Sequence, residues 1–153
     1  MRTGSFTQRS LVSILAPFFV MALTLTLILA PGLAAAGDDL TVRQAHDMAL
    51  KGEILLVDIR SPGEWRQSGV APEAMTISMH EEGFYARLDE AVKGDHSRPV
   101  AVICAAGGRS AMMRAQLVLR GYTNVSNVPA GMTGGPNGPG WIASGLPVVP
   151  YRQ

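Results

Sequence analysis

The sequence has 153 residues, 13 lysines and arginines against 12 aspartates and glutamates, and a single cysteine. A chain of this size forms one ordinary domain, and its nearly balanced charge leaves no basic stripe for binding nucleic acid. One cysteine cannot form an internal disulfide, and it excludes zinc and iron–sulfur sites that need several cysteines. The chemistry of that single thiol is therefore the first question that the sequence raises.

The N-terminal residues have the organisation of an export signal. Arg2 and Arg9 precede an uncharged, leucine-rich run, and three alanines at 34–36 form a small-residue cleavage site. We therefore expect a signal peptide over 1–36, a separate domain over 37–153, and export to the periplasm. Because the apolar run is also long enough to span a bilayer, retention as a membrane anchor, with the domain facing the periplasm, is the alternative.

Signals of helices and strands alternate along the rest of the chain. Thr41 and Gln44 have capping-box spacing, which predicts a helix that ends at Gly52. Two short apolar runs have the composition of strands covered on both faces. The predicted strands are 54–57, 75–78, 100–103 and 124–128, and further helices are predicted over 81–92 and 111–120. Such alternation predicts an α/β fold with a parallel sheet between helices, followed by a glycine- and proline-rich tail over 129–150.

Cys104 directly follows the buried strand 100–103, at the carboxyl end where open α/β sheets bind ligands. Gly107 and Gly108 allow the next residues to curl so that backbone N–H groups converge on one point. The helix that follows adds its free N–H groups, and Arg109 adds a cation. Each feature favours negative charge on the sulfur, so the pattern predicts a nucleophilic thiolate with a lowered pKa.

Four groups of motif residues along the chain resemble the conserved segments of a known family. They are Asp58-Ile59-Arg60 with Glu64-Trp65, Gly69-Val70-Ala71-Pro72-Glu73-Ala74, Cys104-Ala105-Ala106-Gly107-Gly108-Arg109-Ser110, and Gly131-Met132 with Trp141 and Gly145-Leu146-Pro147-Val148. In this order they resemble the D-x-R-x-x-x-E-aromatic, G-H-I-P-G-A, C-x-x-G-x-R-S and G-M…W…G-L-P-V segments of single-domain rhodaneses. The resemblance covers roughly residues 39–150.

The resemblance implies a three-layer fold with a five-stranded parallel sheet and a sulfurtransferase activity. Cys104 would take a sulfane sulfur from a small anionic donor such as thiosulfate and hold it as a persulfide. Cyanide, a thiol or a protein acceptor would then remove the sulfur, without any metal or organic cofactor. Arg109 would orient the anionic donor. The persulfide would be held by the backbone N–H groups of Ala105, Ala106, Gly107, Gly108 and Arg109.

Several residues outside the loop are expected to support the structure. We expect Asp58 and Arg60 to pair as a brace at the end of a strand, and Trp65 and Trp141 to pack over the ends of the sheet. The three histidines, at positions 46, 80 and 96, are expected at the surface. Between Met132 and Trp141 the chain is longer than is usual in the family, and this insertion, 133–140, is expected to be a mobile flap at the rim of the site.

Two other functions stay open on the sequence alone. A non-catalytic binding module could use the same fold, although inactive relatives usually lack the loop cysteine. A cysteine phosphatase or arsenate reductase uses a related C-x5-R loop, but here only four residues separate Cys104 from Arg109. A papain-like site is disfavoured because no histidine lies near the cysteine in the sequence.

Overall fold

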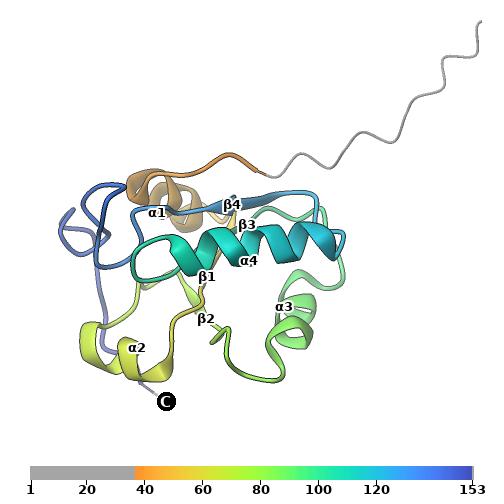
Figure 1. Ribbon diagram of the computed structural model, residues 1–153, viewed down its shortest axis with the longest axis horizontal. Helices are drawn as coiled ribbons and strands as arrows, with labels where there is room; N and C mark the ends of the chain where they lie inside the picture. Colours follow the sequence, from red (N-terminus) through yellow and green to blue (C-terminus); the bar gives the residue numbers. More distant parts are fainter. Residues whose placement is uncertain (1–36, 153) are drawn as a thin grey trace, which may run out of the picture. The chain divides into compact units, whose positions relative to one another are not determined.

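The computed structural model describes residues 37–152, and the predicted signal at 1–36 lies outside them. Helices and strands alternate through the described residues (Figure 1). In chain order they are α1 (Val42–Leu50), β1 (Leu55–Asp58), α2 (Pro62–Ser68), β2 (Met75–Thr76), α3 (Phe84–Val92), β3 (Val100–Ile103), α4 (Gly108–Leu119) and β4 (Val125–Asn127). The predicted α/β fold is confirmed.

The sheet is parallel, with the strand order β2-β1-β3-β4. It has four strands within residues 37–152, so the expectation of five strands was wrong for this part of the chain. Along the outer edge of β4, the Leu40 N–H donates to the Asn127 carbonyl at 2.8 Å. Within residues 37–41 this bond does not extend into a strand, and helix α1 begins two residues later.

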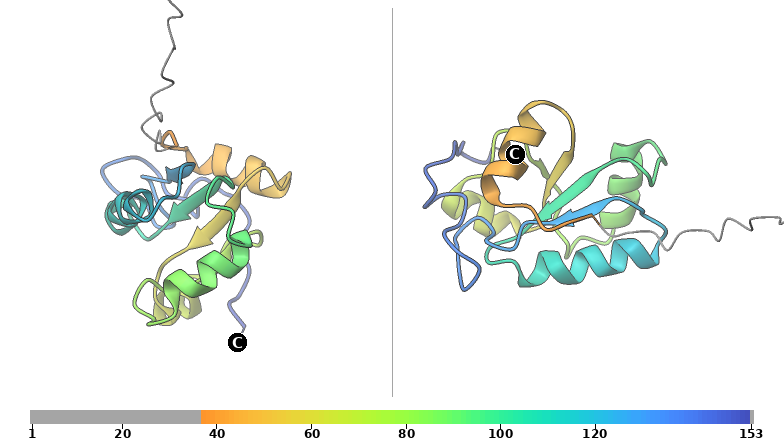
Figure 2. Two further views of the ribbon diagram at one scale, coloured as in Figure 1. Left: turned by 90° about the vertical axis from the view of Figure 1, so that its right-hand side faces the viewer. Right: turned by 90° about the horizontal axis from the view of Figure 1, so that it is seen from above.

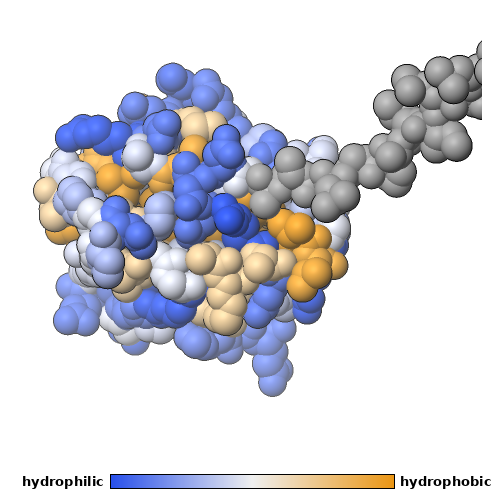
Figure 3. All heavy atoms as spheres, turned by 45° about the horizontal axis from the view of Figure 1, so that its top comes forward, coloured by the Kyte–Doolittle hydropathy of each residue, from blue (hydrophilic) through white to orange (hydrophobic). Residues whose placement is uncertain are grey.

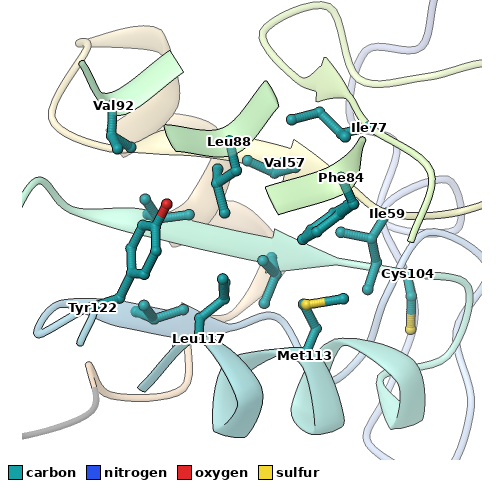
Figure 4. Close-up of a cluster of buried hydrophobic side chains, with 13 residues drawn as sticks. Val57, Ile59, Ile77, Phe84, Leu88, Val92, Cys104, Met113, Leu117 and Tyr122 are labelled. Carbon is teal, nitrogen blue, oxygen red and sulfur yellow. The ribbon is translucent and has the colours of Figure 1, made fainter. Parts of the chain in front are cut away.

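Side chains of the sheet alternate between two buried layers, which explains the uninterrupted apolar runs. On β3, Val100 and Val102 pack with α3 and α4, whereas Ala101 and Ile103 face α1 and the C-terminal segment. Helices therefore cover both faces of the sheet (Figure 2). Cys104 continues the alternation on the α3/α4 side, where it closes one end of the core beside Met113 (Figure 4).

The helix boundaries depend on local capping. The predicted capping box of Thr41 and Gln44 is present at the start of α1. A second capping box, formed by Ser61 and Glu64 with proline at the first helical positions, begins α2, a helix that was not predicted. Helix α4 begins at Gly108, three residues earlier than predicted. As a result, Glu64 and Arg109 both lie in the first turns of helices.

The C-terminal tail is irregular but contributes to the core. Trp141 and Met132 are completely buried, and Trp65 is buried against Tyr151, so both tryptophans pack as expected. Of the three histidines expected at the surface, His80 is exposed and the His96 side chain is 37% exposed, but His46 is only 14% exposed, so the expectation was wrong for His46. His46 packs edge-on against Trp141, and the ring of His96 stacks on Tyr122.

The surface is largely polar in Figure 3, with an apolar patch across the face shown. On α4, the side chains of Met112 and Leu119 are exposed. Within residues 37–152, none of the helices combines the length and the apolar character that crossing a membrane requires.

Candidate active site

The loop after β3 turns sharply around the cysteine and enters α4. At the helix N-cap, Gly107 has φ of 90°, and a Cβ atom there would collide with the carbonyl oxygen of Pro129. Gly131, with φ of 63°, allows an equally close approach to the carbonyl of Ala105. These two glycines therefore let the loop and the segment after β4 pack backbone against backbone.

Backbone hydrogen bonds secure this packing. The Met132 N–H donates to the Cys104 carbonyl at 2.8 Å, and the Thr133 N–H donates to the Ala105 carbonyl at 2.9 Å. The hydroxyl of Thr133 donates to the same Ala105 carbonyl at 3.0 Å. These bonds satisfy two carbonyls of the loop from outside and hold the loop in place around the sulfur.

The sulfur of Cys104 lies in a ring of donors. The Gly107 N–H donates to Sγ at 3.2 Å, and the Ser110 hydroxyl lies 3.4 Å from Sγ. Burial raises the pKa of the Cys104 thiol, but hydrogen bonds from the Ser110 hydroxyl and from the N–H groups of Ser110, Ala106 and Gly107 outweigh it. The net pKa is lowered from its ordinary value of 9.0.

Ser110 was not among the predicted site residues, although it closes the loop motif. Its side chain is completely buried, and its hydroxyl also donates to the Gly107 carbonyl at 3.0 Å. The hydroxyl can rotate between this carbonyl and the sulfur, so it can accept from the thiol or donate to the thiolate. In the sequence, Ser110 could be recognised as a site residue only from its hydroxyl group and its position in the first turn of the helix after the cysteine.

Access to the sulfur is narrow. Cys104 is 1% exposed, whereas Ala106 and Gly108 of the same loop are exposed at its mouth. A hollow of about 440 Å³ lies elsewhere, where the start of α1 meets the segment around Pro129 and Ala130. The thiol is thus suited to a small reactant or to a thin protruding group, not to a bulky one.

Arg109 is paired inside the chain. Its Nη1 and Nη2 donate to the two carboxylate oxygens of Glu64 at 2.9 and 2.5 Å. The Arg109 hydrogen bond is the main reason that the pKa of Glu64 is lowered from 4.5 to about 2. The pKa of Arg109 is raised mainly by the hydrogen bonds to Glu64, and to a smaller extent by the charge of the nearby Cys104. Glu64 was missed because α2 was not predicted.

Asp58 and Arg60 form the expected pair at the end of β1. Nε and Nη2 of Arg60 donate to the Asp58 carboxylate at 2.7 to 3.0 Å, and both side chains are almost completely buried. Arg60 also donates to the Ser68 hydroxyl and to the Gly69 carbonyl, each at 2.7 Å. The pair therefore fixes the end of α2, which carries Glu64 to the cysteine loop.

The insertion 133–140 lies beside the cysteine loop, as expected. Gly135 and Gly138 exchange two backbone hydrogen bonds of 3.1 Å, and Asn137 donates to the Pro129 carbonyl at 3.3 Å. A Cβ atom on Gly135 would contact the Ala106 methyl group at 3.4 Å. The segment is a hydrogen-bonded turn at the rim, and its mobility stays a prediction.

The predicted loop residues thus come together, with Glu64 and Ser110 added to them. Across residues 37–152, no group of three or more histidine, cysteine, aspartate and glutamate side chains is placed to hold a metal ion. The arrangement can stabilise an anion on sulfur next to a neutral arginine–carboxylate pair.

Comparison with known proteins identifies the family. A parallel sheet with a cysteine loop at the start of a helix defines the class of cysteine-dependent α/β domains. The family model of the rhodanese-like domain matches residues 41–135, more than half of the chain, so the chain belongs to this family. A comparison with curated protein sequences found no match.

Solved structures agree with this assignment. Rv0390 of Mycobacterium tuberculosis is 27% identical, with a TM-score of 0.61 over 76% of this chain and 100% of that one. The polysulfide-sulfur transferase homodimer of Wolinella succinogenes is 25% identical, with a TM-score of 0.57 over 74% and 78%. A Rhodopseudomonas palustris protein described as a possible tyrosine phosphatase is 21% identical, with a TM-score of 0.55 over 74% and 85%; at this identity the likeness concerns the fold alone.

Proposed function

We propose that the protein is a sulfurtransferase that carries a sulfane sulfur as a persulfide on Cys104. The observation that carries the proposal is the buried thiol whose pKa is lowered by hydrogen bonds from Ser110, Ala106 and Gly107. A relative of the same fold, at 25% identity, is named a polysulfide-sulfur transferase. Donors and acceptors of sulfane sulfur are therefore the substrate class, with thiosulfate as the reference donor and cyanide or a thiol as the acceptor.

The first step is attack by the Cys104 thiolate on the outer sulfur of the donor. A new S–S bond forms, the donor's own S–S bond breaks, and the leaving group, sulfite in the case of thiosulfate, departs with the electron pair. The negative charge then lies on the outer sulfur of the persulfide. N–H groups of Ala106, Gly107 and Ser110 and the Ser110 hydroxyl, which lower the pKa of the Cys104 thiol, support this step, because preorganised donors around the sulfur favour negative charge there.

The second step reverses the roles of the groups. Cyanide attacks the outer sulfur, the persulfide S–S bond breaks, and Cys104 leaves as a thiolate while thiocyanate is released. A thiol acceptor enters as its thiolate and becomes a persulfide in the same way. The lowered pKa of Cys104 serves both steps, because a stabilised thiolate is also a better leaving group.

A phosphatase reaction is less well supported by this geometry. The loop has one residue fewer than C-x5-R, and the guanidinium of Arg109 is held by Glu64 at 2.9 and 2.5 Å, so it is not free to bind phosphate. A binding module would have no need of a thiol surrounded by donors. Both alternatives remain outcomes of the test.

The test is the intact mass of the reduced protein after incubation with a sulfane-sulfur donor. We expect a gain of one sulfur atom, its loss on adding cyanide with release of thiocyanate, and neither event in Cys104→Ser. Hydrolysis of a phosphate ester without any sulfur adduct would favour the phosphatase. A folded, reduced protein without either activity would favour the binding module.

We also propose that the domain works after export, in the periplasm, on the basis of residues 1–36. Sequencing the N-terminus of the protein from its native cell envelope tests this proposal. A start at Gly37 is expected after cleavage, whereas a start at Met1 in the membrane fraction would mean that the leader is kept as an anchor.

A further inference from the structure

The pairing of Arg109 changes the electrostatics of the site. The guanidinium and the Glu64 carboxylate meet through two parallel hydrogen bonds, the strongest arrangement available to this pair. Their side chains are 31% and 30% exposed, so the pair lies at the mouth of the site and is not buried beneath it. A donor that approaches Cys104 therefore meets an arginine whose charge is already balanced.

The balance persists over the physiological pH range. The pKa of Glu64 is about 2, so its carboxylate stays ionised at physiological pH. Within residues 104–110, Arg109 is the one charged side chain besides the Cys104 thiolate. Asp58 and Arg60 neutralise each other inside the fold. The thiolate, Arg109 and Glu64 together carry one net negative charge, which repels a doubly charged donor more strongly than a singly charged one.

We infer that Glu64 is a specificity-determining residue, which by pairing with Arg109 favours sulfane-sulfur donors of low charge over dianionic donors such as thiosulfate. The inference rests on the proposed sulfurtransferase function and names its donor class. Thiosulfonates and organic persulfides belong to this class, since each ends in a sulfane sulfur and carries a single negative charge. The step itself is unchanged: Cys104 bonds to the outer sulfur, and a sulfinate or thiolate leaves with the electron pair.

Two donors of nearly the same shape separate charge from size. Thiosulfate and methanethiosulfonate differ by the replacement of one oxide with a methyl group, which removes one negative charge. Their transfer reactions with Cys104 are otherwise alike and release sulfite and methanesulfinate. The ratio of kcat/KM for the two donors, with cyanide as acceptor, therefore measures the preference of the site for charge.

The variant must remove the charge of Glu64 without removing its helix cap. Glu64 Oε2 accepts from the Ser61 N–H and hydroxyl, each at 3.0 Å, at the start of α2. Glutamine serves the same position of a capping box, so Glu64→Gln keeps this contact while its charge is lost. Ser61→Ala is the matched control, because it weakens the cap and leaves the charge of Glu64 in place.

Steady-state kinetics of the full chain test the inference. Wild type is expected to prefer methanethiosulfonate, and Glu64→Gln is expected to raise kcat/KM for thiosulfate about tenfold, and for methanethiosulfonate by clearly less. Ser61→Ala should leave the ratio of the two donors as in wild type. An unchanged ratio in Glu64→Gln would overturn the inference and leave the proposed function intact.

A measurement on wild type alone serves if the variant does not fold. Raising the ionic strength from about 0.01 M to about 0.15 M should increase kcat/KM for thiosulfate, because salt screens repulsion between like charges. A decrease would mean that Arg109 attracts the donor, and it would overturn the inference. If neither donor leaves a sulfur on Cys104 in any protein, the proposed function fails and the inference falls with it.

Discussion

At the scale of single residues, the ionisation of Cys104 depends on a neighbour that was not among the predicted site residues. Ser110 is buried, lies 3.4 Å from the sulfur and contributes more to the lowered pKa than any backbone donor. Its hydroxyl has one proton, which it can give to the sulfur only by leaving the Gly107 carbonyl. The side chain thus exchanges one hydrogen bond for another as the thiol ionises.

Replacing this hydroxyl should shift the ionisation of Cys104. In Ser110→Ala, we expect the pKa of Cys104 to rise, since its largest stabilising contact with the thiolate is gone. The alkylation rate at neutral pH should fall about tenfold, the effect of about 1.5 kcal/mol for a hydrogen bond to a charged group. The pH dependence of alkylation measures it, with Ser97→Ala, at an exposed serine outside the site, as the control. A rate profile that matches wild type would assign the lowered pKa to the backbone alone.

A buried charge pair has a different role at the same scale. Asp58 and Arg60 are almost completely buried, so a charge left without its partner is costly. We expect Asp58→Asn to lower the free energy of unfolding by about 3 kcal/mol. Glu81→Gln breaks the exposed pair with Arg87 and should cost less than about 1 kcal/mol. Urea denaturation measures both, and equal losses would contradict the role assigned to burial.

At the scale of elements, the conformation of the junction between β3 and α4 requires glycine at position 107 but not at position 108. Gly107 has φ of 90° and lies against the Pro129 carbonyl, whereas a Cβ atom on Gly108 would meet no atom within 4 Å. Gly107→Ala is therefore expected to lose at least about 2 kcal/mol of stability. Gly108→Ala should leave it unchanged or raise it by up to about 1 kcal/mol.

Thermal unfolding of the two alanine variants measures this difference, with circular dichroism confirming that the helices are retained. The adjacent glycines differ in backbone conformation and in what surrounds them, so they form a close internal control. Similar unfolding temperatures would mean that the loop can move away from Pro129 at little cost.

The helices and strands that could be predicted are those with a strong pattern in their own residues. The strands around Val57 and Val102 were predicted because burial on both faces leaves an unbroken apolar run. Helix α2 was missed although Ser61 and Glu64 repeat the capping box used for α1, since its seven residues lack an apolar stripe. The number of strands was taken from the family, and the short segment before α1 did not follow it.

The candidate site, too, could be predicted only where its signals are local in the sequence. The loop 104–109 could be predicted because its residues are consecutive in the sequence and directly follow a strand with an unbroken apolar run. The pairing of Glu64 with Arg109 could not be predicted, because the two residues are far apart in the sequence and meet only after both helices have formed. Contacts of this kind depend on the packing of elements, for which a single sequence has no local signal.

At the scale of the whole domain, carboxylates join elements that are distant in the sequence. Glu64 joins α2 to α4, and Asp89 of α3 accepts from the Tyr122 hydroxyl at 2.6 Å and from His96. The pKa values of both carboxyl groups are lowered, that of Asp89 mainly by the Tyr122 hydrogen bond. Both contacts are stronger with the ionised form, so acid should weaken the packing of α2 on α4 and of α3 on the segment after α4.

The pH dependence of unfolding should show the contribution of Glu64 directly. Its pKa is 4.5 in the unfolded reference and about 2 in the fold, so its stabilisation is complete above pH 4.5 and is lost as the pH falls toward 2. Measured by urea denaturation, the stability of wild type should therefore fall more steeply across this window than that of Glu64→Gln, and the two should converge near pH 2. The contribution of Asp89 remains in both proteins and cancels in the comparison. Parallel curves would mean that the carboxylate gains nothing from Arg109 in the folded state, and the charge balance assigned to the mouth of the site would then have no thermodynamic basis.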